Sequence, residues 1–176
     1  MKHLKSYIIQ FSGLSFGKHE FTFDIDKRFF DSYEYSIVKD GNLTAEVVLD
    51  RQPTMMLVDF HIKGTVQLTC DVCLKEFDGD VDIDANLIVK FTDQDLEEIT
   101  DDIIVLSRNE HEFSVADLLY EHINLSIPHY VRCDEPGGDQ TCYEEMIAIL
   151  HNLAPKIESE EPSDPRWEML KKLKKK

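Results

Sequence analysis

The sequence predicts an α+β fold in which an antiparallel, strongly curved or barrel-like β-sheet is followed by a helical C-terminal part. Two observations predict it. Successive segments in the first 111 residues alternate apolar and polar side chains at period two, with no long helical segment between them. Strong helical spacing of apolar residues begins only after residue 112. We therefore expect a single domain over residues 1–154, mainly β over 1–111 and helical over 112–154.

The first elements are two predicted strands and a short helix. Residues 4–11 and 19–25 are rich in aromatic and β-branched side chains, which favour strands. In the second of these segments apolar and polar residues alternate, as is typical of a strand with one buried face. Residues 26–35 then predict a short helix with Asp26 as its N-cap.

Three longer segments, 43–51, 55–69 and 81–91, are expected to form the main sheet. Gly64 interrupts the apolar row of the second segment, which predicts a bend or a close approach of another backbone there. A Cys-x-x-Cys turn separates the second and third segments and is therefore predicted to be the tip of an antiparallel hairpin. Strands that follow one another without long helices favour a curved antiparallel sheet or a barrel.

Two helices are predicted in the C-terminal half of the domain. The first covers residues 114–127, with a capping-box-like start at Ser114 and an end before Pro128. It leads directly to a loop that contains two cysteines. The second helix is predicted over residues 143–153, where apolar residues recur at helical spacing.

The last part of the chain differs in composition from the domain. Residues 155–163 are rich in Pro, Ser and Glu and predict a flexible linker. Residues 164–176 begin with Asp-Pro, which is typical of a helix start, and predict a basic C-terminal helix or tail.

Charge is distributed very unevenly along the chain. The net charge is −16, yet residues 166–176 hold six Lys or Arg and one acid, so residues 1–165 carry −21. An acidic body repels a phosphate backbone, and RNA or partner contact is therefore expected at the basic tip. The expected contact residues are Arg166, Trp167, Lys171, Lys172, Lys174, Lys175 and Lys176. The alternative for this lysine run is a solubilising tail.

The four cysteines form two pairs that are far apart in the sequence. Cys70 and Cys73 lie on one tight turn, at a spacing that suits two of the four ligands of a tetrahedral zinc ion. Cys133 and Cys142 flank a loop that contains two glycines, which allow the loop to fold back on itself. We expect these four residues to be ligands of a structural zinc ion. His129, and less so His122, are possible substitute ligands.

Three other interpretations of the cysteines stay open at this point. They could be unligated core residues, because a free cysteine behaves as a small hydrophobic side chain. Cys70 and Cys73 could be a redox pair, although such pairs usually open a helix in a strand–helix unit. Disulfides require an oxidising compartment, and the N-terminal residues show no signal peptide.

The remaining motifs do not predict an enzyme. The sequence contains no G-x-S-x-G, no Walker A motif, no G-x-G-x-x-G and no H-E-x-x-H. We expect no small-molecule substrate. No apolar run approaches the ~20 residues of a membrane-spanning helix, so we expect a soluble cytoplasmic protein with no membrane contact.

Three stretches in this order resemble a known family. CDVCLKEF, DLLYEHINLSIPHYVRC and DPRWEMLKKLK resemble the YceD family, the large ribosomal RNA subunit accumulation proteins. The resemblance covers the chain from about residue 60 to its end. The chain departs from the pattern at CDEPGGDQTC, where many relatives have a tighter cysteine cluster.

The resemblance implies a bacterial cytoplasmic protein, or an organelle relative, with a role in accumulation of 23S ribosomal RNA and assembly of the large ribosomal subunit. It implies no enzymatic activity, and its partners would be ribosomal RNA, ribosomal proteins or assembly proteins. The alternative hypothesis is a metal-dependent hydrolase or a thiol redox protein that uses the Cys/His cluster with an open coordination position.

Overall fold

The computed structural model describes residues 3–92, 103–134 and 142–153 of the chain. The chain forms two compact units, residues 1–143 and 144–176. Within the described residues, the second unit consists of helix α3 (Glu144–Leu153), none of whose residues is buried. The predicted linker 155–163 and basic segment 164–176 lie outside the described residues.

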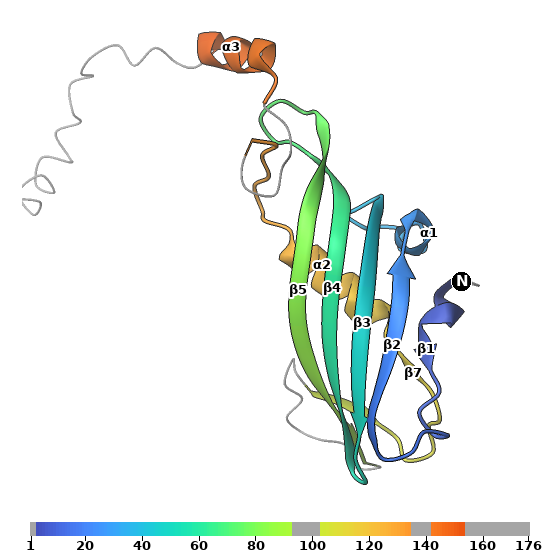
Figure 1. The fold of residues 1–176 in the computed structure, drawn as a ribbon. Helices are drawn as coiled ribbons and strands as arrows, with labels where there is room; N and C mark the ends of the chain where they lie inside the picture. The colour runs from blue at the N-terminus through green and yellow to red at the C-terminus, as the bar shows by residue number, and fades with distance from the viewer. Residues whose placement is uncertain (1–2, 93–102, 135–141, 154–176) are drawn as a thin grey trace, which may run out of the picture. The chain divides into compact units, whose positions relative to one another are not determined.

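The first unit is built on one large β-sheet and one small one (Figure 1). The large sheet has five strands in the order β2-β3-β4-β5-β6, and all neighbours are antiparallel except β5 and β6, which are parallel. Its strands are β2 (Gly17–Ile25), β3 (Gly41–Arg51), β4 (Met55–Thr69), β5 (Glu76–Phe91) and β6 (Ile103–Leu106). The small sheet pairs β1 (Ile8–Ile9) with β7 (Phe113–Ser114).

The predicted fold class is wrong in two respects. The sheet is open and not strongly curled, since β2 and β6 are its two edges and no ladder joins them within the described residues. The helices are mostly short, and no helical C-terminal bundle is present in the part of the chain that the structure describes. An alternating pattern requires only that one face of each strand be covered, and here a helix and the N-terminal segment cover it, so closure into a barrel is not needed.

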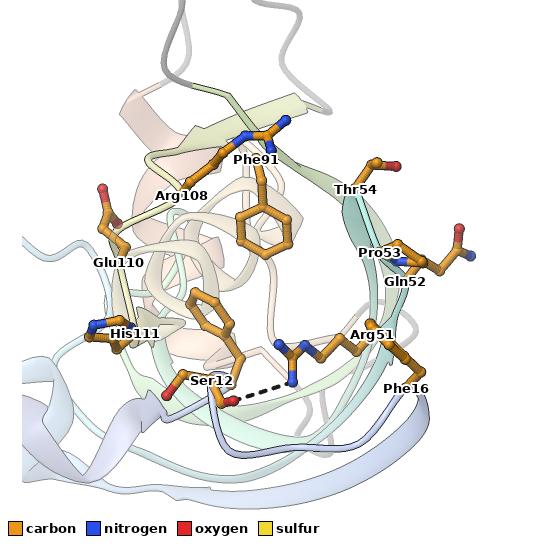
Figure 2. Close-up of a pocket in the computed structure, with 11 residues that line it drawn as sticks. Ser12, Phe16, Arg51, Gln52, Pro53, Thr54, Phe91, Arg108, Glu110 and His111 are labelled. Carbon is orange, nitrogen blue, oxygen red and sulfur yellow. Dashed lines mark hydrogen bonds between the residues drawn. The ribbon is translucent and has the colours of Figure 1, made fainter.

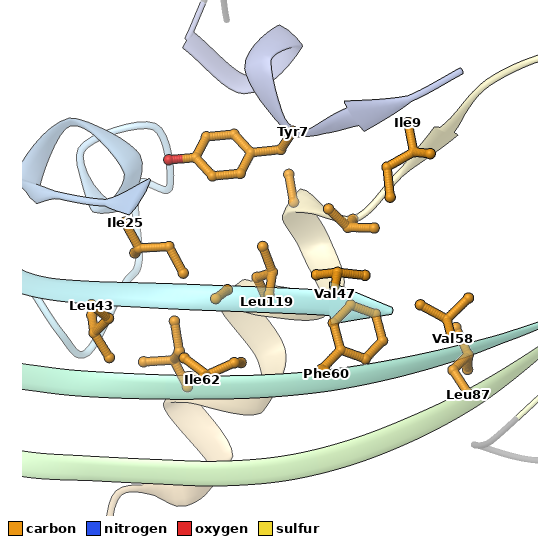
Figure 3. Packing of buried hydrophobic residues seen from close by; sticks show 14 of the residues in the cluster. Tyr7, Ile9, Ile25, Leu43, Val47, Val58, Phe60, Ile62, Leu87 and Leu119 are labelled. Carbon is orange, nitrogen blue, oxygen red and sulfur yellow. The ribbon is translucent and has the colours of Figure 1, made fainter. Parts of the chain in front are cut away.

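The apolar core lies on the inner face of the sheet (Figure 3). Helix α2 (Ala116–Ser126) lies across this face, and Leu119 points from it toward the sheet residues Val47 and Phe60. Tyr7 and Ile9 add the N-terminal segment to the same core. The predicted strands 43–51, 55–69 and 81–91 all lie within β3, β4 and β5, and the buried residues of each strand are apolar and occupy alternate positions.

The short N-terminal elements follow the sequence only in part. Residues 4–11, predicted to be a strand, form a 3₁₀ helix, η1 (His3–Tyr7), and the two residues of β1. Helix α1 (Lys27–Phe30) begins as predicted, because the Asp26 carboxylate accepts hydrogen bonds from the backbone N–H groups of Arg28 and Phe29. Its Phe29 and Phe30 are buried.

Two further predictions have opposite outcomes. The N-cap predicted at Ser114 is wrong: Ser114 ends β7, and α2 starts after Val115 without a side-chain cap. The close backbone approach predicted at Gly64 is confirmed. Gly64 has φ +151°, and a Cβ atom at this position would collide with the Asn42 carbonyl oxygen and the Leu43 Cα.

Candidate metal centre

The turn between β4 and β5 positions the first two cysteines. The β4–β5 ladder is antiparallel up to the pair Thr69 and Glu76, so this turn is the hairpin tip that the sequence predicts. The Cys70 N–H donates to the Lys75 carbonyl at 2.9 Å, and the Leu74 N–H donates to the Cys70 carbonyl at 2.9 Å. Leu74 adopts the left-handed region, with φ 58°. The tight turn directs both thiols to the same side.

The segment after α2 brings the second pair to this tip. Two hydrogen bonds join the segments: the Asp71 N–H donates to the Val131 carbonyl at 2.9 Å, and the Val131 N–H donates to the Asp71 carboxylate at 2.7 Å. Arg132 donates to both carboxylate oxygens of Asp134 at 2.9 and 2.7 Å, and this pair holds the pKa of Asp134 below its usual range. Cys133 lies between Arg132 and Asp134 and is thereby fixed beside the hairpin.

The four sulfur atoms converge in a buried cluster. All four lie within 4.8 Å of one another, with Cys70 Sγ 3.8 Å from Cys142 Sγ and Cys73 Sγ 3.7 Å from Cys133 Sγ. Each side chain is buried, with at most 6% of the residue exposed. A disulfide requires sulfurs at about 2.05 Å, so these cysteines are free thiols.

The thiol pKa values shift in opposite directions in the two cysteine pairs. Burial raises the pKa of the Cys70 thiol, but backbone N–H groups of Cys73, Cys133 and Val72 outweigh burial and lower this pKa to about 6. Burial, with the neighbouring thiols, raises the pKa of Cys133 to about 12. Four buried thiolates repel one another unless a cation lies between them.

The donor set and its geometry suit a metal ion. Four sulfurs placed about 2.3 Å from a central ion at tetrahedral angles are about 3.8 Å apart, close to the separations of 3.8 and 3.7 Å for the pairs Cys70–Cys142 and Cys73–Cys133. The four buried cysteines could therefore hold a metal ion. Four thiolates fill a tetrahedral coordination sphere and leave no position for water or substrate.

The two histidines considered as substitute ligands are not part of the cluster. His129 is exposed and lines a cavity of about 550 Å³ beside Asp71 and Val131. The His122 ring, on α2, packs against Phe60 with the ring centroids 5.6 Å apart, and its Nε2 has no hydrogen-bond partner among the described residues. Among the described residues, no other group of three or more His, Cys, Asp or Glu could hold a metal ion.

A second cavity lies at the opposite end of β4, beside the turn that joins it to β3. It has a volume of about 320 Å³ and is lined by aromatic rings and polar side chains, with the Arg51 guanidinium pointing inward (Figure 2). Arg51 donates hydrogen bonds to the carbonyls of Ser12 and Leu14 and lies 5.5 Å from the centre of the Phe16 ring. Sequence reasoning missed this cavity: Pro53 predicts a turn, but no pattern predicts that Arg51 reaches back to the loop before β2.

Other predicted features have no structural description. The expected RNA or partner contacts, Arg166, Trp167, Lys171, Lys172, Lys174, Lys175 and Lys176, lie outside the described residues. Among the described residues, no helix is both long and apolar enough to cross a membrane.

The fold and the cluster define a class: an open, mainly antiparallel sheet whose longest hairpin ends at a buried site of four cysteines. A comparison with protein families matches residues 58–174, more than half of the chain, to the family described as "Large ribosomal RNA subunit accumulation protein YceD". The chain therefore belongs to the YceD family, as its sequence motifs predict. No curated protein and no solved structure matches the chain.

Proposed function

We propose that this protein is a non-enzymatic binding factor in the accumulation of 23S ribosomal RNA and the assembly of the large ribosomal subunit. The observation that carries the proposal is a closed cluster of four thiols in a member of a family described by large ribosomal RNA subunit accumulation. A cluster without an open position supports a binding scaffold. It argues against a hydrolase, whose metal ion needs an open coordination position.

In this proposal Cys70, Cys73, Cys133 and Cys142 hold a structural zinc ion. Zinc accepts four thiolate ligands in a tetrahedral site, and the N–H groups directed at Cys70 stabilise its thiolate form. The bound ion would tie the β4–β5 hairpin tip to the segment that follows α2. Its role would be to keep these two distant parts of the chain together as one docking surface.

The basic segment 164–176 supplies the proposed contact with RNA or an acidic surface. Its lysines carry positive charge, whereas residues 1–163 carry −20. Replacing Lys171, Lys172 and Lys174 by Gln should weaken binding to ribosomal RNA and reduce its dependence on salt. Unchanged binding and an unchanged salt dependence would remove this segment from the proposal.

Two experiments test the proposal. Depletion of the protein from growing cells should reduce mature 23S ribosomal RNA or cause its precursor to accumulate, and normal levels of both would contradict the proposed role. Metal analysis of the purified protein should find about one zinc per chain. Cobalt substitution should then give the absorption of a tetrahedral tetrathiolate site, whereas the Cys70→Ser variant should not.

A further inference from the structure

Among the residues that the structure describes, the β5 edge of the large sheet has no partner strand over most of its length (Figure 1). Strand β5 pairs with β4 from Glu76 to Lys90, but β6 joins its other side only from Ile88 to Phe91. Between residues 76 and 87, within the described part of the chain, the backbone of β5 has a strand on one side only. Exposed edges of this kind are templates for another strand.

The opposite edge of the sheet is partly covered. On β2 the Asp24 carbonyl accepts a hydrogen bond from the Tyr7 hydroxyl at 2.6 Å, and the N-terminal segment packs beside it. The two edges of the same sheet therefore differ, and β5 is the one that can accept a long additional strand.

The outward side chains of this edge are acidic. Asp78, Asp80, Asp82 and Asp84 occupy every second position of β5 and are exposed. Asp82 pairs with Lys63 of β4 at 3.5 Å, and Asp84 lies 2.8 Å from Nδ1 of His61 on the same strand. Within the described residues, no ion pair joins Asp78 or Asp80 to a basic side chain, so their charges face solvent.

The inward side chains next to this edge are apolar and incompletely covered. Ile83 and Ala85 are half-buried members of the core, while Val81 is buried. Because side chains of a paired strand alternate between the same two faces, a strand added here would place every second side chain beside aspartates and the others beside these apolar residues.

We infer that the open edge of β5 binds an extended segment of a partner protein in which basic and apolar residues alternate. This inference rests on the proposed function, which identifies the partner as a basic ribosomal or assembly protein that supplies the segment. Added strands bind through main-chain hydrogen bonds and are selected by alternate side chains. Lysine or arginine side chains of the segment meet this row of aspartates, above all Asp78 and Asp80, and its apolar side chains extend the inner face of the sheet.

The negative charge of this edge argues against two other occupants, a second copy of the chain and a nucleic acid. A second copy of the chain, paired antiparallel about Asp82, would place Asp80 opposite Asp84, and like charges directly opposite each other are destabilising. A nucleic acid would bring phosphates against the same aspartates. The exposed face of β2 to β5 is acidic as a whole, with Glu20, Asp24, Glu46, Asp59 and Glu76 in addition to the four aspartates, against Lys18, Lys63 and Lys90.

The test uses the zinc-loaded full-length protein and a capped eight-residue peptide that alternates Lys and Val. Its binding is followed by fluorescence anisotropy and by amide hydrogen exchange. Every second amide between residues 77 and 87 should become protected, because the alternate amides already bond to β4. The same peptide methylated at every backbone nitrogen keeps its charge but should not bind. Equal binding of the methylated peptide, or no new protection in β5, overturns the inference.

Matched variants test the role of the aspartates. Asp78→Asn with Asp80→Asn should weaken the peptide about fivefold at low salt, as expected for the loss of two surface charge pairs. Glu20→Gln with Glu46→Gln removes the same charge from β2 and β3 and should change affinity less than twofold. Equal losses in both variants overturn the inference, as does protection of β5 by an RNA oligonucleotide or by self-association. No ribosome is present, so these outcomes are independent of the depletion experiment.

Discussion

The middle of the sheet and the tip of the β4–β5 hairpin are held together by different forces. Under the middle, apolar side chains from β3, β4, β5 and α2 form a continuous buried core. At the tip, the cluster consists of four cysteines, and hydrogen bonds between Asp71 and Val131 join the two segments. The middle is therefore held by apolar packing, whereas the tip carries four buried thiols that could hold a metal ion.

This difference follows from the length of the strands. β4 and β5 have 15 and 16 residues, whereas the helix α2 that packs on their inner face has 11. A strand rises about 3.3 Å per residue and a helix about 1.5 Å. The long hairpin therefore extends past the helix, and its end needs a contact of another kind.

The largest expected effect is on the tip. Cys70→Ser should abolish zinc binding, and loss of a metal present at 1,000 times its Kd removes about 4 kcal/mol of stability. At about 2–4 °C per kcal/mol for a protein of this size, the unfolding temperature should fall by roughly 8–16 °C. Differential scanning calorimetry of metal-loaded protein measures this shift.

A chelator provides the control for this variant, because all four cysteines of the chain belong to the cluster. EDTA should lower the unfolding temperature of the unaltered protein to that of Cys70→Ser and leave the variant unchanged. If EDTA has no effect on the unaltered protein, metal does not stabilise the tip.

A comparable but metal-independent loss is expected in the middle of the sheet. Leu119 on α2 is 0% exposed, and Leu119→Ala should reduce stability by about 2–5 kcal/mol through lost burial and a residual cavity. Leu125→Ala on the same helix is the matched control, since Leu125 is 74% exposed and its change should be near zero. Zinc content should be the same in both variants. Loss of zinc in Leu119→Ala would show that the core and the tip do not form independently.

Alkaline pH should lower the stability of the apolar core under the middle of the sheet and leave the tip unchanged. Burial and the charges of Asp26 and Asp24 raise the pKa of Tyr7 to about 12, and burial with the hydrogen bond to Asp117 raises the pKa of Tyr33 as well. A raised pKa in the folded state means stability that is complete below about pH 10 and is lost as pH rises toward the folded value. Acidification should instead release zinc from the tip, because metal binding requires thiolates.

Phenolate absorbance measured against pH tests this expectation. Tyr7 should ionise only near pH 12 and Tyr33 well above its usual range, together with a fall in the denaturant midpoint. Tyr7→Phe should remove one late-ionising group. Ionisation of Tyr7 near the ordinary tyrosine pKa of about 10 would contradict its burial.

The sequence predicts local features of this protein better than their arrangement. Period-two alternation placed β3, β4 and β5, and the Cys-x-x-Cys spacing placed a hairpin tip, because both signals are local. Closure of a sheet depends on pairing between β2 and β6, which are far apart in the sequence, and no local pattern encodes it. Convergence of Cys133 and Cys142 on the tip was predicted from residue type, whereas the Asp71 and Val131 contacts that join the segments leave no pattern in the sequence.

The smallest expected change in stability is at Leu74, in the turn at the tip. Leu74 is 68% exposed and lies in the left-handed region, with φ 58°, where a residue with a Cβ is strained by about 1–2 kcal/mol. Asparagine adopts this region more readily, so Leu74→Asn should raise stability by about 0.5–1 kcal/mol with zinc content unchanged. Leu74→Ala keeps the Cβ and the strain, and its denaturant midpoint should stay at the unaltered value. Equal midpoints for the two variants would mean that the turn is not strained and that its conformation adds nothing to the dependence of the tip on its thiols.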